Sequence, residues 1–285
     1  MVRFRYVLST YNIEHVVPLN NGIPQGSPLS AILFIVAFDQ LSKILNTFNK
    51  MEHALYADDA IIFTKTAQMS IVEETFSQII NKIAEWGKVS GATLSIEKCK
   101  IIHICKKRNC QTINVNINNI AIELVSKLRI LGVIFDSKYT FKQHCLELRK
   151  QLATRLNIIK YLSSSYSCIH ISTLVNVTRS LVLSKIDYAL PIYGHCCKTN
   201  LQLLNGPYHG AVRRSISAFP TSPTKAILAE AGLPSIDERV KSSTFKLAAK
   251  LYNSNSSILH LDVNRAIKHK KNYKKNLLSA FALKR

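Results

Sequence analysis

Hydrophobic and polar residues follow two different patterns along the chain, and the change of pattern predicts two kinds of structure. In the first half, short runs rich in Val, Ile, Phe and Tyr are separated by turn residues, which is typical of strands. Beyond Phe141, apolar residues recur at spacings of three and four, which is typical of amphipathic helices. The sequence therefore predicts an α+β region followed by a helical region.

The first region is predicted to contain several short strands and two helices. Ser27 and Pro28 suit a helix start, because serine caps the first turn and proline fits the first helical position. Gly91 suits the end of the second helix. The predicted helices are Pro28–Asn46 and Ile71–Val89; the predicted strands are Val2–Val7, Ile13–Val17, two strands within His53–Lys65 that turn at Asp58-Asp59, and further strands within Thr93–Ile104 and Ile113–Phe135.

The second region is predicted to be helical, with breaks at serines and prolines. The predicted helices are Cys145–Leu162, Ile169–Ala189, Leu201–Ala218 and Asp237–Asn253. Breaks are expected at the serines of residues 163–165 and at Pro191, Pro220, Pro223 and Pro234, because proline cannot continue a helix. We place the boundary between the two regions near Tyr139.

Charge separates the same two regions. The 285 residues carry 38 Lys+Arg and 17 Asp+Glu, a net charge of +21. Residues 1–140 hold 15 basic and 11 acidic residues, whereas residues 141–285 hold 23 and 6, so +17 lies in the second half. This asymmetry favours a polyanionic partner. For any single cluster, a solvated basic face is the alternative. An acidic membrane is disfavoured, because the basic helices lack a Trp- and Phe-rich apolar face.

The sequence predicts an intracellular protein. The longest apolar run, Ala31–Phe38, is far shorter than the roughly 20 residues of a membrane span. The residues after Met1 contain neither the apolar core nor the cleavage site of a signal peptide. Seven cysteines in a chain of this length predict reduced thiols.

The tetrapeptide Tyr56-Ala57-Asp58-Asp59 places two adjacent carboxylates between apolar strands. Like charges held this close raise each other's pKa. A divalent cation such as Mg²⁺ or Mn²⁺ removes the repulsion, because these ions prefer hard oxygen ligands. Taken alone, the tetrapeptide is weak evidence for a metal site, because an Asp-Asp pair at a hairpin tip is more often a polar turn.

Further segments accompany this tetrapeptide in a fixed order. Gly22–Phe34, with its Pro-Gln-Gly-Ser sequence, precedes it; Trp86-Gly87 with Gly91–Lys100, and then Leu128–Asp136, follow it. Together they resemble motifs B, C, D and E of the reverse transcriptases of non-LTR retrotransposons, most closely those of jockey-like insect elements. Ser184–Gly194 and Glu230–Ser235 resemble the helical thumb and the following segment of the same elements.

The resemblance implies a fold, an activity and a set of partners. The fold would be α+β, with a truncated right-hand polymerase palm in residues 1–140, a helical thumb and extension in 141–262, and a basic tail in 263–285. The activity would be RNA-directed DNA polymerisation with two Mg²⁺ or Mn²⁺ ions. The partners would be an RNA template, a DNA primer and duplex, and deoxynucleotide triphosphates, and the location would be nuclear. The resemblance does not indicate an oligomeric state.

The resemblance also assigns residues to the catalytic centre. Asp58 would be the main metal ligand, and Asp59 a second or supporting carboxylate. Gln25 and Gly26 would approach the template base and the incoming nucleotide, where glycine permits close backbone contact. Tyr56 would belong to the same nucleotide- and template-binding set.

Two further assignments leave alternatives open. Lys98 or Lys100 would lie near the pyrophosphate leaving group, but a single sequence does not choose between them, and solvated surface lysines are the alternative. Leu131, Gly132 and Val133 would form the hairpin that grips the primer, and an ordinary core strand is the alternative.

One family feature is not found. The metal-binding Asp of motif A would lie on a strand before Gly22, where the sole acid is Glu14, and the basic fingers segment is not seen either. We therefore expect residues 1–285 alone not to polymerise DNA, since active-site groups act as a unit. The alternative function is a non-catalytic, basic, nucleic-acid-binding remnant.

Overall fold

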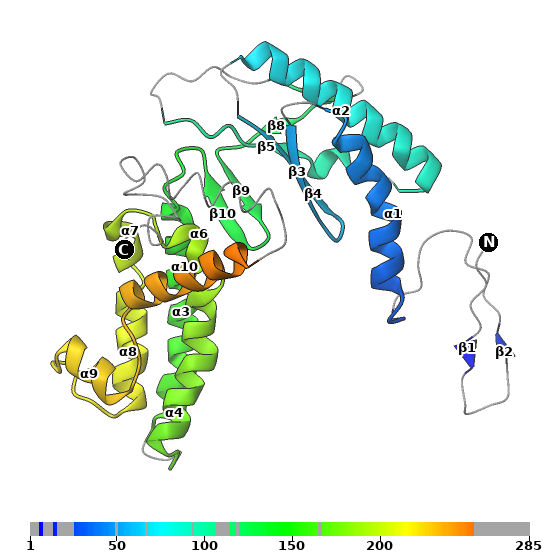
Figure 1. The fold of residues 1–285 in the computed structure, drawn as a ribbon. Coiled ribbons are helices and arrows are strands. Elements are labelled where there is room, and N and C mark those ends of the chain that lie inside the picture. Colours follow the sequence, from blue (N-terminus) through cyan, green and yellow to red (C-terminus); the bar gives the residue numbers. More distant parts are fainter. Residues whose placement is uncertain are drawn as a thin grey trace. The chain divides into compact units, whose positions relative to one another are not determined.

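The computed structural model describes residues 6–7, 14–15, 26–48, 51–65, 68–92, 94–106, 114–117, 120–164 and 167–253. The chain divides into two compact units, the first formed by Met1–His103 with Lys107–Ser126 and the second by Ile104–Lys106 with Lys127–Arg285. The mixture of helices and small sheets is compatible with the predicted α+β class (Figure 1). None of the helices in the described ranges is long and apolar enough to cross a membrane.

The first unit consists of short strands and two long helices. Within its described residues every sheet has two strands: β1–β2, β3–β4 and β6–β7 are antiparallel, and β5–β8 is parallel. The elements are β1 (Tyr6–Val7), β2 (Glu14–His15), α1 (Ser30–Leu45), β3 (Met51–Tyr56), β4 (Asp59–Thr64), α2 (Met69–Ser90), a 3₁₀ turn (Ile96–Lys98), β5 (Lys100–Ile101), β6 (Asn116–Ile117), β7 (Ile120–Ala121) and β8 (Glu123–Leu124).

The core of the first unit lies between its long helices and one face of the β3–β4 hairpin. Leu41 and Leu45 of α1 and Ile79 and Trp86 of α2 form the buried cluster, and alternate residues of β3 pack against it. This arrangement follows from the periods of the two structures, because alternate strand residues share one face and residues three or four apart share one side of a helix. The opposite face of the hairpin carries exposed side chains.

Local sequence signals predict one of the two helix ends correctly and the other incorrectly. Gly91 ends α2 in a left-handed conformation with φ 77°, as the sequence predicts. Ser27 does not cap α1 as expected. The helix begins at Ser30, and the Ser27 carbonyl accepts the Ser30 N–H at 3.1 Å, so Ser27 forms the turn before the helix.

The second unit begins with an antiparallel hairpin and continues as helices. Its elements are β9 (Lys127–Ile130), β10 (Val133–Asp136), α3 (Lys142–Leu162), α4 (Ile171–Thr178), a π-helical turn (Arg179–Leu183), α5 (Ser184–Asp187), α6 (Leu190–Tyr193), α7 (Lys198–Gln202), α8 (Asn205–Ser215), α9 (Thr224–Glu230) and α10 (Ile236–Tyr252). The helices predicted for this region are therefore present, although two of them are subdivided.

One continuous apolar core joins the hairpin to the helices of the second unit. Val133 of β10 and Phe141, just before α3, belong to the same buried cluster as Leu152 of α3 and Tyr208 of α8. The division between the compact units therefore falls at Lys127. The hairpin belongs with the helices because its apolar face is buried against them.

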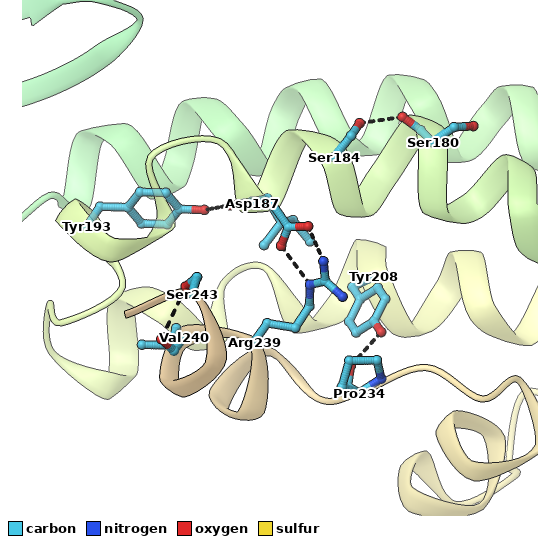
Figure 2. Close-up of polar contacts among 10 residues, drawn as sticks. Ser180, Ser184, Asp187, Tyr193, Tyr208, Pro234, Arg239, Val240 and Ser243 are labelled. Carbon is cyan, nitrogen blue, oxygen red and sulfur yellow. Dashed lines mark hydrogen bonds and ion pairs between the residues drawn. The ribbon is translucent and has the colours of Figure 1, made fainter. Parts of the chain in front are cut away.

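The predicted helix Ile169–Ala189 contains a π-helical turn. The Ser184 N–H bonds to the Arg179 carbonyl five residues back, which leaves the Ser180 carbonyl without its usual amide partner. The Ser184 hydroxyl donates to that carbonyl instead (Figure 2). Serine hydroxyls bond readily to backbone carbonyls one turn earlier, so this residue stabilises the irregular turn.

Prolines also act differently from the prediction. Pro191 opens the short helix α6, since proline suits the first helical turn, whose N–H groups have no intrahelical partner. The predicted helix Leu201–Ala218 is split between α7 and α8. Proline thus marks a helix boundary here without ending the helical region.

Helix α10 is attached by side-chain contacts at its start. Ser235 and Glu238 form a reciprocal capping box. Arg239 then binds Asp187 of α5 with two donors, the Nε to Oδ1 distance being 2.6 Å (Figure 2). The Tyr208 hydroxyl of α8 donates to the Pro234 carbonyl at 2.7 Å. These contacts fix the first turns of α10 against α5 and α8.

The cysteines differ in oxidation state. Cys99, Cys145, Cys168, Cys196 and Cys197 are free thiols. Cys105 is disulfide-bonded, so the prediction of reduced thiols is wrong for this residue.

Candidate functional site

The Asp-Asp pair lies at the tip of the β3–β4 hairpin. Tyr56 and Asp59 are opposite each other in the ladder, which leaves Ala57 and Asp58 as the connecting residues. Ala57 has φ 50°, a left-handed conformation that costs a non-glycine residue about 1 kcal/mol or more. The turn lies at residues 57–58, one position before the predicted 58–59, and it presents both carboxylates at the end of the hairpin.

Both carboxylates are accessible. Asp58 and Asp59 are exposed, and neither carboxylate forms a hydrogen bond or ion pair with another described residue. Unpartnered carboxylate oxygens suit Mg²⁺ or Mn²⁺ chemically. Within the described ranges no cluster of three or more His, Cys, Asp or Glu side chains could hold a metal ion. The hairpin thus presents two carboxylates whose chemistry would suit such an ion.

The two faces of this hairpin differ in character. His53 lies on the packed face, where its Nε2 is 2.9 Å from the Ser42 hydroxyl of α1. Tyr56 and Asp59 lie on the other face, together with Phe63, and the tyrosine is 65% and the phenylalanine 47% exposed. Exposed aromatic rings beside a carboxylate provide surfaces on which nucleotide bases can stack.

None of the contacts found for the other predicted residues of the first unit involves the tip of the hairpin. Gly26 precedes α1 with φ 92°, and no atom lies within 4 Å of where a Cβ would stand. Gln25 lies outside the described residues. Lys100 forms an ion pair with Glu123 at 3.3 Å, whereas Lys98 is exposed and has no ion-pair partner among the described residues.

The β9–β10 hairpin has a tight two-residue turn. Leu131 has φ 45° and Gly132 φ 82°, and left-handed backbone at both central residues is the requirement of a type I′ turn. The Tyr188 hydroxyl donates to the Leu131 carbonyl at 2.6 Å. Leu131 and Gly132 are exposed, but Val133 is 3% exposed and lies in the core, so its side chain cannot meet a ligand.

The predicted site residues thus fall into two groups. Those of motifs B, C and D belong to the first unit, and those of the Leu-Gly-Val strand belong to the second. The sequence reasoning missed Tyr188, which holds the second hairpin. No local signal identifies this residue, because it lies far along the chain from Leu131, the residue it contacts.

Helix α3 presents a basic stripe to solvent. Lys142, Arg149 and Lys160 are exposed and are spaced by about two and about three helical turns, so they share one side of the helix. Leu148 and Leu152 lie about 80–120° around the helix axis from this stripe and are buried. Such a one-sided arrangement of cations suits contact with a phosphate backbone.

Comparison with known proteins identifies relatives. Residues 3–135 match the family described as "Reverse transcriptase (RNA-dependent DNA polymerase)". The chain is 23% identical over 243 residues to an RNA-directed DNA polymerase from the mobile element jockey of Drosophila funebris, which covers 83% of this chain and 26% of the relative.

Two further relatives are also described as RNA-directed DNA polymerases of mobile elements. The jockey polymerase of Drosophila melanogaster is 22% identical over 83% of this chain and 26% of its own length. A probable RNA-directed DNA polymerase from transposon X-element of that species is 23% identical over 70% of this chain and 22% of its own length. The chain spans about a quarter of the length of these relatives. No solved structure matches it significantly.

Replacement of Gly132 by alanine should destabilise the second hairpin. The left-handed backbone disfavours a side chain by about 1–2 kcal/mol, and the new Cβ would lie 3.2 Å from Tyr188 Cε1. We expect the melting temperature of Gly132→Ala to fall. Gly206→Ala is the control, because its Cβ would meet no atom within 4 Å. Equal stability of the two variants would contradict the turn geometry.

Proposed function

We propose that this chain, which carries a reverse transcriptase segment related to those of non-LTR retrotransposons, forms part of an RNA-directed DNA polymerase. The observation that carries the proposal is the pair of unpartnered carboxylates at the tip of the β3–β4 hairpin. Residues 1–140 would act as the palm, 141–262 as the thumb and extension, and 263–285 as a basic tail. Because such elements copy themselves at chromosomal DNA, we also propose a nuclear location.

The carboxylates would hold the divalent ions of nucleotidyl transfer. Asp58 at the tip would be the main ligand, and Asp59 the second or supporting one. Mg²⁺ or Mn²⁺ bound there would activate the primer hydroxyl and neutralise charge on the phosphates. Tyr56 stands on the same face as Asp59, which supports a role beside the nucleotide. Lys98, being unpaired among the described residues, is better suited than Lys100 to the leaving pyrophosphate.

The second unit would hold the template–primer duplex. The stripe Lys142, Arg149 and Lys160 supports this role, because cations that face solvent along one side of a helix can follow a phosphate backbone without reading sequence. The exposed turn Leu131–Gly132 would contact the primer through its backbone. RNA, DNA and deoxynucleotide triphosphates are accordingly the proposed partners.

Residues 1–285 by themselves would lack catalysis. Before Gly22 the sequence offers only Glu14 as a further acid, and Glu14 lies in β2 opposite Val7. A set of two carboxylates leaves the metal ions under-coordinated compared with the three-carboxylate set that the family resemblance implies. The second candidate function is therefore non-catalytic nucleic-acid binding, which the +17 charge of residues 141–285 favours.

Replacement of Asp58 should weaken metal binding. Asp58→Asn removes a charged oxygen ligand, and we expect the Mn²⁺ affinity, measured by water-proton relaxation, to fall by about tenfold or more. Asp39→Asn is the matched control, because Asp39 is an exposed aspartate of the same unit that is already paired with Lys43 at 2.7 Å. Equal Mn²⁺ affinities in both variants would show that the hairpin carboxylates are only a polar turn.

Purified residues 1–285 should not extend a primer. With an RNA template, a DNA primer, deoxynucleotides and Mg²⁺ or Mn²⁺, we expect no product above the level of Asp58→Asn, because loss of one catalytic group costs orders of magnitude in rate. Robust extension that Asp58→Asn abolishes would show instead that the chain contains a complete metal site.

Nucleic-acid binding should be steeply salt-dependent and nearly independent of sequence. Each of Arg149→Gln and Lys160→Gln should lower the slope of log affinity against log salt by about 1, since each removes one phosphate contact. Lys82→Gln changes the same charge in the first unit, where Lys82 pairs with Glu85 at 3.0 Å, and should leave the slope unchanged. Fluorescence anisotropy with oligonucleotides of unrelated sequence measures the affinity of all three variants at several salt concentrations. Binding that does not respond to salt would exclude the backbone-contact proposal.

A further inference from the structure

Three of the free thiols lie together in the second unit, and the proposed function uses none of them. Cys145 lies in the first turn of α3, and Cys196 and Cys197 lie in the connection between α6 and α7. Cys145 is fully buried, Cys196 is half-buried and Cys197 is exposed. Among the described residues these thiols do not form a metal-binding group. The cluster therefore leads from the core of the unit to its surface.

Cys145 and Cys196 are in direct contact, although they are distant in the sequence. The Cys145 thiol donates a hydrogen bond to Cys196 Sγ. The Cys196 thiol donates in turn to the Cys197 carbonyl, with 3.6 Å between sulfur and oxygen. Cys196 also packs against the buried cluster to which Cys145 belongs. The two sulfurs are thus neighbours, which is the first requirement of a disulfide.

The two segments that carry these cysteines are held against each other close to the pair. Helices α3 and α7 are in contact. Asn200 of α7 donates from Nδ2 to the Thr140 carbonyl, just before α3, at 3.0 Å. The Cys196 N–H bonds to the Tyr193 carbonyl at 3.0 Å, which fixes the backbone of this cysteine in a turn. The contact between Cys145 and Cys196 is therefore built into the fold of the second unit.

The two thiols differ in reactivity. The hydrogen bond from Cys145 lowers the pKa of Cys196; burial opposes part of this effect, and backbone N–H groups, among them that of Leu201, support it. The same hydrogen bond and burial raise the pKa of Cys145. Since the thiolate is the nucleophile, Cys196 is the thiol that can attack a molecule from solution. Cys145 is enclosed in the core and can attack only a sulfur that lies beside it.

We propose that Cys145 and Cys196 form a reversible disulfide, which makes the second unit sensitive to redox conditions. The oxidant is a small-molecule disulfide such as oxidised glutathione. The Cys196 thiolate attacks one sulfur of this oxidant, so that a mixed disulfide forms and one glutathione leaves. Cys145 then loses its proton, and its sulfur attacks Cys196 Sγ and releases the second glutathione. Two protein thiols are oxidised, one small disulfide is reduced, and the two thiol protons pass to the departing glutathiones.

The disulfide would act on the helix that carries the basic stripe. It would join the first turn of α3 covalently to the segment before α7, two parts of the unit that hydrogen bonds and apolar contacts hold together in the reduced chain. A cross-link between residues that are distant in sequence restricts the unfolded chain and so stabilises the folded one. An excess of a reducing thiol would reverse the reaction and return the unit to its original stability.

Treatment of the full chain with oxidised glutathione, followed by proteolysis without reductant and mass spectrometry, tests the pairing. We expect a peptide pair that links Cys145 to Cys196 and that separates on addition of dithiothreitol. The melting temperature should rise by about 5 °C or more on oxidation. Cys168→Ala is the control, because it removes an exposed thiol outside the cluster and should leave both results unchanged.

Cys145→Ala and Cys196→Ala should each abolish the linked peptides and the rise in melting temperature. Because Cys145 is a core residue, Cys196→Ala tests the same pairing at a half-buried position without emptying the core. The Cys105 disulfide responds to the redox conditions in every variant, so the difference between variants isolates the proposed bond.

Three results would overturn the proposal. The first is a disulfide between Cys196 and Cys197 in place of the expected one. The second is a glutathione mixed disulfide on Cys196 that persists, since Cys145 would then not reach it. The third is an equal rise in melting temperature for Cys196→Ala and the unaltered chain. Asp58→Asn should be oxidised as the unaltered chain is, so failure here is distinguishable from failure of the polymerase proposal.

Discussion

Burial of one side of α3 is the constraint on which the second unit depends. Cys145, Leu152 and Ile159 are fully buried, so the helix can present only its other sides to water and to ligands. A side next to the core, about 80° around the helix axis, carries the basic stripe, and the N-terminal turns carry His144 and Glu147. Because a helix is rigid and has a fixed period, its packing in the core also determines where these charged groups stand.

The acids of the second unit mostly serve internal contacts. Asp187 binds Arg239, Glu238 caps α10, and Glu147 accepts from Gln151. In the same unit Lys142, Arg149 and Lys160 face solvent. This division of roles explains how a region with few acids can hold its helices together and still present a positive surface. The positive field is thus a consequence of the fold as well as of composition.

Both candidate hairpins have a strained residue at the tip. Ala57 and Leu131 have left-handed backbone, which is uncommon for residues with a side chain. The Leu131 turn is held by the Tyr188 hydroxyl and by the buried Val133 that follows it. Such strain is frequent at functional positions, where the surrounding structure maintains it. The two turns coincide with the segments that the family resemblance assigns to metal binding and to the primer.

The sequence by itself determined the local structure and the chemistry of the first hairpin. Short apolar runs on either side of the Asp58-Asp59 turn predicted two strands within His53–Lys65, a three- and four-residue period predicted α2, and Gly91 predicted its end, because these signals act within a few residues. The adjacent carboxylates Asp58 and Asp59 could also be identified from sequence, since they are neighbours along the chain.

Only the tertiary structure decided which core buries the second hairpin and which distant residues become neighbours. The hairpin β9–β10 belongs with the helices because Val133 is buried among them. A local sequence pattern does not indicate which core will bury a given strand. Cys145 and Cys196 are distant in sequence and become neighbours only when α3 packs beside the connection between α6 and α7. Local periodicity is a property of the backbone, whereas a site built from separate elements depends on how those elements pack together.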